Sequence, residues 1–124
     1  MARKIKFRGR QISNGAWAYG YIYQAQGRWF IHVADEKKSY DCYEIDPKTV
    51  GEYIGRQDIK TKEIYEDDIV ISEYDDRKRV VEWCEEEACY KMRHLQNESW
   101  CENLFFNDVD EIEVIGSIHT IVMI

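Results

Sequence analysis

The most constraining feature of this sequence is a row of aromatic residues at every second position near the N-terminus. The row consists of Trp17, Tyr19, Tyr21 and Tyr23, with small or aliphatic residues between them. A period of two places alternate side chains on one face of a strand, whereas a helix requires apolar residues three or four positions apart. We therefore predict a long β-strand with an aromatic face.

Shorter segments with strand composition follow along the chain and are separated by turn signals such as Ser13-Asn14-Gly15 and Asp46-Pro47. Residues 56–67 lack alternation and predict a loop, with one helical turn around Ile64-Tyr65. The acidic run Glu85–Glu87 could open a second short helix, because acids suit a helix N-terminus. Strands are expected at 4–8, 17–23, 28–33, 40–45, 49–54, 68–74, 79–84, 88–93 and 111–118.

These elements predict a mainly β fold, either a small partly open β-barrel or a strongly bent antiparallel sheet, with one or two short helical turns. The 124 residues contain one proline and no Gly/Ser linker, so a single domain spanning residues 1–124 is the simple interpretation. No stretch reaches the ~20 apolar residues of a membrane span, and the basic N-terminus lacks the apolar core of a signal peptide. We expect a cytoplasmic protein.

Charge is unevenly distributed along the sequence, which has a net charge of −7. The first twelve residues are basic and contain no acid. If residues 4–10 form a strand, their four cations share one face, with Ile5 and Phe7 directed inward. That face could follow a phosphate backbone while the aromatic row stacks bases; alternatively, it is a solvated face beside a core aromatic row. The candidate nucleic-acid-binding residues are Lys4, Lys6, Arg8 and Arg10.

The second half of the chain is strongly acidic. Residues 63–113 carry 17 acidic side chains and five basic ones. Such a surface could imitate the charge of nucleic acid and inhibit a host DNA-binding factor, or it could simply keep the protein soluble. The acidity of the whole chain also counts against binding to nucleic acid.

Four cysteines invite a test for metal binding and catalysis. The spacing of Cys84, Cys89, His94 and Cys101 is C-x4-C-x4-H-x6-C, without the tight C-x2-C knuckle usual in structural zinc sites. On a strand, Cys89 and His94 would face opposite sides. No glycine-rich phosphate loop or nucleophile signature is present. We therefore expect reduced thiols, no bound metal or cofactor, and no enzymatic activity.

Several ordered segments resemble the YopX family of phage and prophage proteins. They are KIKFRG at 4–9, WAYGY at 17–21, DPKTVGEYIG at 46–55, KEIYEDDIV at 62–70, VVEW at 80–83 and EVIGSI at 113–118. The resemblance implies a small β protein of a phage or prophage, acting in a bacterial cytoplasm, and implies no particular reaction. Asp67 stands where the family pattern has glycine, which suggests a backbone with positive φ that Asp tolerates.

Taken together, these features favour a non-enzymatic accessory protein that acts by protein binding and self-association. The apolar C-terminal run 118–124 and exposed strand edges could form a contact between subunits. The expected partners are a second copy of the chain and an unknown bacterial or phage protein. The alternatives are a nucleic-acid-binding β-barrel that uses the basic strand, and an acidic decoy or counter-defence protein.

Overall fold

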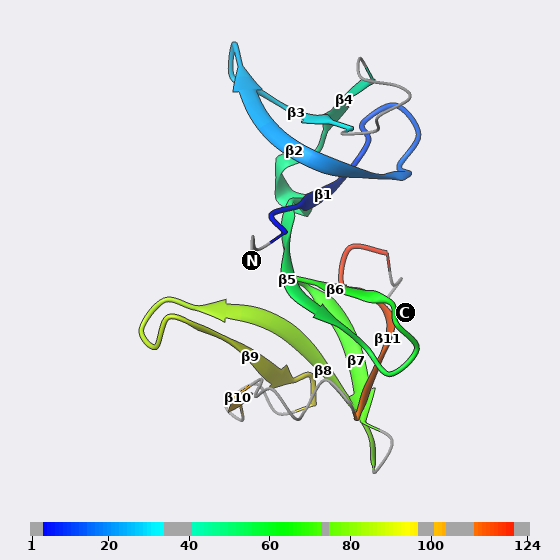
Figure 1. Ribbon diagram of the computed structural model, residues 1–124, viewed down its shortest axis with the longest axis vertical. Helices are drawn as coiled ribbons and strands as arrows, with labels where there is room; N and C mark the ends of the chain where they lie inside the picture. Colours follow the sequence, from blue (N-terminus) through cyan, green and yellow to red (C-terminus); the bar gives the residue numbers. More distant parts are fainter. Residues whose placement is uncertain (1–3, 34–40, 73–74, 97–100, 104–110, 121–124) are drawn as a thin grey trace. The chain divides into compact units, whose positions relative to one another are not determined.

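The computed structural model describes residues 4–33, 41–72, 75–96, 101–103 and 111–120 (Figure 1). Within these ranges the chain forms eleven strands and one short helix, arranged in two antiparallel sheets. The mainly β fold predicted from the alternation is confirmed, and neither sheet closes into a barrel. Internal contacts divide the chain into two compact units, residues 1–53 and 54–124, which are described in turn.

The N-terminal unit is a meander of antiparallel strands. In spatial order these are β4 (Cys42–Ile45), β3 (Arg28–His32), β2 (Trp17–Ala25), β1 (Phe7–Arg10) and the start of β5 (Gly51–Gln57). The two-residue turn Gln26-Gly27, with positive φ at both positions, joins β2 to β3. Turns of this kind match the right-handed twist of paired strands, and Figure 1 shows β2 as a long, curved strand.

One face of this sheet forms the core of the N-terminal unit. Ala18, Ile31 and Ile45 are buried there, and the partly buried Ile22 and Trp29 pack against them. Each fully buried aliphatic side chain contributes about 1.5–3 kcal/mol. Because successive residues of a strand point to opposite faces, burial of Ala18 and Ile22 places the odd-numbered residues of β2 on the other face.

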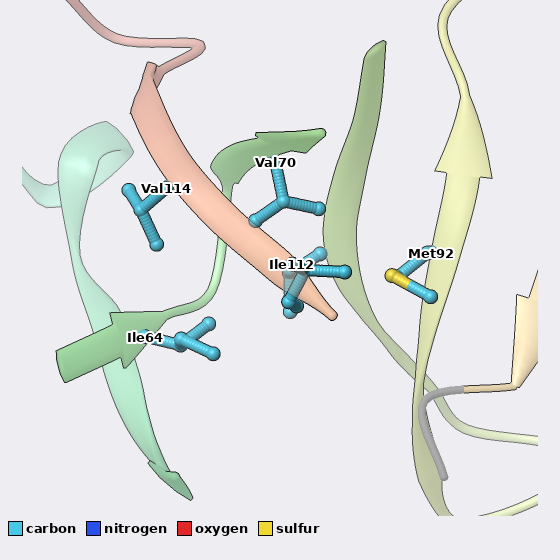
Figure 2. Packing of buried hydrophobic residues seen from close by; sticks show 6 residues of the cluster. Ile64, Val70, Met92, Ile112 and Val114 are labelled. Atoms are coloured by element: carbon cyan, nitrogen blue, oxygen red, sulfur yellow. The ribbon is translucent and has the colours of Figure 1, made fainter. Parts of the chain in front are cut away.

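The C-terminal unit contains a five-stranded sheet. Its spatial order is β10 (Cys101–Asn103), β9 (Cys89–His94), β8 (Asp75–Cys84), β7 (Asp68–Ser72) and β11 (Ile112–Ser117). The end of β5 also lies in this unit, where β6 (Glu63–Tyr65) neighbours it. The core cluster, drawn as sticks in Figure 2, contains Ile64, Val70, Val81, Met92, Ile112 and Val114.

Both predicted helical turns are wrong. Ile64 is fully buried and belongs to β6, because the extended backbone directs this side chain into the core. Residues 85–88 form the turn between β8 and β9, and the pairing of Cys84 with Cys89 leaves too few residues for a helix. Strand β10 was also not predicted.

The helical turn that does form is the 3-10 helix η1 (Pro47–Thr49). The Asp46 carboxylate accepts a hydrogen bond from the Lys48 amide, 3.0 Å away, and Pro47 supplies a φ suited to the first turn. Among the described residues, no helix is long and apolar enough to cross a membrane.

Candidate functional site

Three tyrosines on β2 are exposed. Tyr19, Tyr21 and Tyr23 are 41%, 53% and 45% accessible, while Ala18 between them is buried in the core. The alternative in which these tyrosines form a core row is therefore wrong. Exposed tyrosines at alternate positions present their rings on one face of the strand, a surface that can stack planar ligands. We call Trp17, Tyr19, Tyr21 and Tyr23 the aromatic row.

Two cations from the N-terminal segment lie over rings of this row. The Arg8 guanidinium carbon is 4.2 Å from the centroid of Trp17, and Lys6 Nζ is 5.7 Å from that of Tyr19. The register between β1 and β2 supports this arrangement. Arg8 is paired directly with Tyr19, so it lies on the same face as Trp17 and is its diagonal neighbour. Cation–π contacts of this kind hold the charged groups against the aromatic surface.

The predicted stripe of four exposed cations is only partly present. Strand β1 begins at Phe7, so Lys4 and Lys6 precede it, and Ile5 is 55% exposed instead of directed inward. Arg8 is only 5% exposed, because its flat guanidinium packs on the Trp17 indole. Arg10 is partly buried, and its Nε donates a hydrogen bond to the Gly15 carbonyl oxygen at 2.8 Å.

An open hollow of about 320 Å³ lies beside the aromatic row. It combines aromatic walls with the stems and ammonium groups of two lysines. A planar group entering it would meet tyrosine rings, while an attached anion could reach the lysines. The lining residues are Lys4, Ile5, Lys6, Tyr19, Gly20, Tyr21 and Val33.

At the other end of the row, the aromatic surface continues onto β3. Tyr23 and Phe30 are directly paired, and their rings stack with centroids 5.2 Å apart. Arg28 lies 6.0 Å from the Phe30 centroid and forms a salt bridge to Glu44 at 2.7 Å. Sequence reasoning missed Arg28 and Phe30, although the two-residue turn at Gln26-Gly27 would have placed Phe30 opposite Tyr23.

The Tyr23 hydroxyl also contacts a cysteine. Its oxygen lies 2.7 Å from Cys42 Sγ. This hydrogen bond raises the pKa of Tyr23, and desolvation and the charge of Cys42 act in the same direction. The shift extends to higher pH the range over which this phenol stays neutral.

The two units differ in charge. Residues 1–53 contain nine basic and six acidic residues, a net charge of +3, whereas residues 54–124 contain eight basic and 18 acidic residues, a net charge of −10. The acidity of the whole chain thus belongs to the C-terminal unit. The aromatic row stands on the unit whose charge suits an anionic ligand.

The four residues considered for zinc are distributed over the three neighbouring strands β8, β9 and β10. Cys84 pairs with Cys89 at its turn, whereas His94 lies five residues further along β9, roughly 17 Å at ~3.4 Å per residue. Cys101 pairs with Arg93, far from the turn. Among the described residues, no three His, Cys, Asp or Glu side chains gather closely enough to hold a metal ion.

The outer edge of β11 is partly covered by a loop of its own unit. Ile59 donates its amide to the Ile112 carbonyl at 3.0 Å, and Val114 donates its amide to Asp58 Oδ2 at 2.8 Å. These bonds occupy backbone groups that a second chain would need for strand pairing. Ile118 is 41% exposed, and residues 121–124 of the predicted subunit contact lie outside the described residues.

Comparison with known proteins adds a family to this description. A search of curated proteins found no match. A family model described as YopX protein matches residues 4–120, which include the aromatic row and every described strand. Since this match covers nearly the whole sequence, the chain belongs to the YopX family.

Proposed function

We propose that this protein is a non-enzymatic binding protein whose N-terminal unit binds single-stranded nucleic acid on the aromatic row. The observation that carries the proposal is the exposure of three alternating tyrosines beside Lys6 and Arg8. Proteins that bind single strands with little sequence preference combine stacking rings with nearby cations. The protein partner and phage setting suggested by the sequence are compatible with this activity and remain proposals.

The spacing of the tyrosines favours an extended single strand. Alternate residues of a strand are about 6.8 Å apart, twice the rise per residue, whereas stacked nucleotides advance about 3.4 Å. Bases on Tyr19, Tyr21 and Tyr23 would therefore be separated from one another, each lying on a ring. A duplex keeps its bases stacked and paired, so we expect it to bind more weakly.

The cations fall into two roles. Arg8 is buried against Trp17 and orients the aromatic surface, whereas Lys4 is exposed and Lys6 lines the hollow beside Tyr19 and Tyr21. The two lysines are therefore the proposed phosphate contacts. With so few of them, binding should be weak and moderately sensitive to salt, at a slope of roughly 0.7 for each phosphate neutralised.

The proposal is tested by fluorescence anisotropy with a labelled thymidine oligonucleotide. Tyr21→Ala should weaken binding about tenfold, since stacking one base contributes ~1–3 kcal/mol. Tyr43→Ala is the matched control, because Tyr43 is 36% exposed and pairs with the core residue Ile31, on the opposite face of the same sheet. It should change affinity less than twofold. Lys4→Gln with Lys6→Gln should weaken binding and flatten the salt dependence.

Absence of salt-dependent binding, or equal losses in Tyr21→Ala and Tyr43→Ala, would refute the proposal. The second candidate is self-association through the same exposed tyrosines. It predicts that Tyr21→Ala lowers the molecular mass measured by light scattering without an oligonucleotide present. The acidic-decoy hypothesis concerns the C-terminal unit and predicts inhibition of a DNA-binding protein that survives Tyr21→Ala.

A further inference from the structure

The β8–β9 hairpin brings two cysteines together at its turn. Cys84 is the last residue of β8, Cys89 is the first of β9, and the register pairs them directly. Both are free thiols and both are partly exposed. Directly paired residues point to the same face of a sheet, so the two sulfurs lie side by side and can be reached by small molecules.

The pairing satisfies the geometric requirement for a disulfide. Opposed residues in antiparallel strands have Cα atoms about 4.5 or 5.5 Å apart, depending on the hydrogen-bonding pattern. Both separations fall in the ~4.4–6.8 Å range over which disulfides form. Closing a bond between Cys84 and Cys89 therefore requires side-chain rotation and little movement of the backbone.

The surroundings on the two faces of the hairpin differ. On the face opposite the thiols, Trp83 and Tyr90 form an edge-to-face pair with centroids 5.0 Å apart. On the thiol face lies Lys91, whose ammonium is 2.8 Å from Glu87. Glu87 raises the pKa of Lys91, desolvation lowers it, and the charges of Cys84 and Cys89 raise it further. A positive charge is thus near both sulfurs.

From this geometry we propose that Cys84 and Cys89 form a reversible dithiol–disulfide couple that exchanges with small-molecule disulfides such as glutathione disulfide. One protein thiolate attacks the disulfide, forming a mixed disulfide and releasing one glutathione thiolate. The second protein thiol loses its proton and attacks the mixed disulfide, releasing the second glutathione. Two protein thiols are oxidised, one disulfide is reduced, and two molecules of glutathione leave.

The bond would close the hairpin at its turn. Only four residues lie between the cysteines, so the loss of unfolded-state entropy is small, and the couple should respond to redox conditions without determining whether the chain folds. The proposal concerns the C-terminal unit and does not depend on nucleic-acid binding by the aromatic row.

The test uses the full chain carrying Cys42→Ser and Cys101→Ser, so that only the hairpin cysteines remain. The protein is equilibrated with defined ratios of reduced and oxidised glutathione, quenched with acid, alkylated and measured by mass spectrometry. We expect loss of the mass of two hydrogens, a Cys84–Cys89 link in the peptide map, and little glutathione adduct. Reduced glutathione should reverse the change.

Two controls make the result decisive. Adding Cys84→Ser leaves Cys89 without its partner, so a stable glutathione adduct should accumulate there. Repeating the equilibration in urea removes the register, and the internal disulfide should fall several-fold at the same glutathione ratio. Accumulation of adducts on both cysteines of the folded protein, crosslinked dimers, or equal disulfide formation in urea would overturn the proposal.

Discussion

The carboxylate of Asp67 lies 2.9 Å from Nε2 of His119, and it does so from a residue whose backbone has a φ of 70°. The positive φ that the sequence resemblance implied for Asp67 is confirmed. The carbonyl oxygen of Asp67 also accepts the Ile118 amide at 3.0 Å. At this turn the side chain therefore adds a contact that glycine could not provide, at the cost of a less favourable backbone.

We predict that Asp67→Ala is more destabilising than Asp67→Gly. Both variants lose the contact with His119, about 1 kcal/mol. Glycine also relieves the positive φ, which costs a non-glycine residue roughly 1 kcal/mol or more, whereas alanine retains it as Asp67 does. Urea unfolding should thus place Asp67→Gly close to the wild type and Asp67→Ala about 1 kcal/mol below it. His119→Ala isolates the loss of the side-chain contact. Equal stabilities of the two Asp67 variants would contradict this account.

The hydrogen bond between Tyr23 and Cys42 predicts a pH effect. The pKa of Tyr23 is raised, chiefly by this bond, so folding favours the protonated phenol. Its contribution to stability is present below the ordinary tyrosine pKa of about 10 and is lost as pH rises through the higher folded value. Cys42→Ala should lower the pKa of Tyr23, measured by the near-ultraviolet absorbance of tyrosinate. An unchanged titration would exclude Cys42 as the cause.

Gly20 provides a prediction about the sheet that carries the aromatic row. A Cβ at this position would collide with the carbonyl oxygen of His32, and φ is 155°. Gly20→Ala should therefore destabilise the protein by about 2–4 kcal/mol, through backbone strain and overpacking. Gly27→Ala is the control, since its Cβ would meet no atom within 4 Å although φ is 75°. It should cost only about 1 kcal/mol in urea unfolding.

Asp58 is predicted to be a structural residue of the C-terminal unit. It is 6% exposed, and its carboxylate accepts hydrogen bonds from the amides of Lys60, Lys62 and Val114, each 2.8 Å away. Asp58→Ala leaves these amides without that partner and should cost about 2–4 kcal/mol in chemical unfolding. Asp46→Ala, which removes the partly exposed cap of η1, should cost only about 1 kcal/mol. Similar losses at both positions would refute the distinction.

Some of this fold could be predicted because the responsible signals are local. The alternation from Trp17 to Tyr23 predicted β2, and the glycine position of the family pattern predicted the positive φ of Asp67. Ile64 shows the limit of such signals. A short apolar segment in a polar loop has no period of its own, and packing against Val70 and Ile112 made it a strand.

The candidate site shows the same division. The sequence alone determined that the aromatic residues share one face, because side-chain alternation follows from backbone geometry. The pairing of β1 with β2, which places Arg8 beside them, came from the tertiary structure. Only the tertiary structure decided which face is exposed. Ile31 and Ile45, distant in the chain, bury the Ala18 face and leave the tyrosines in solvent. Burial depends on what packs against a strand, and no local pattern records that.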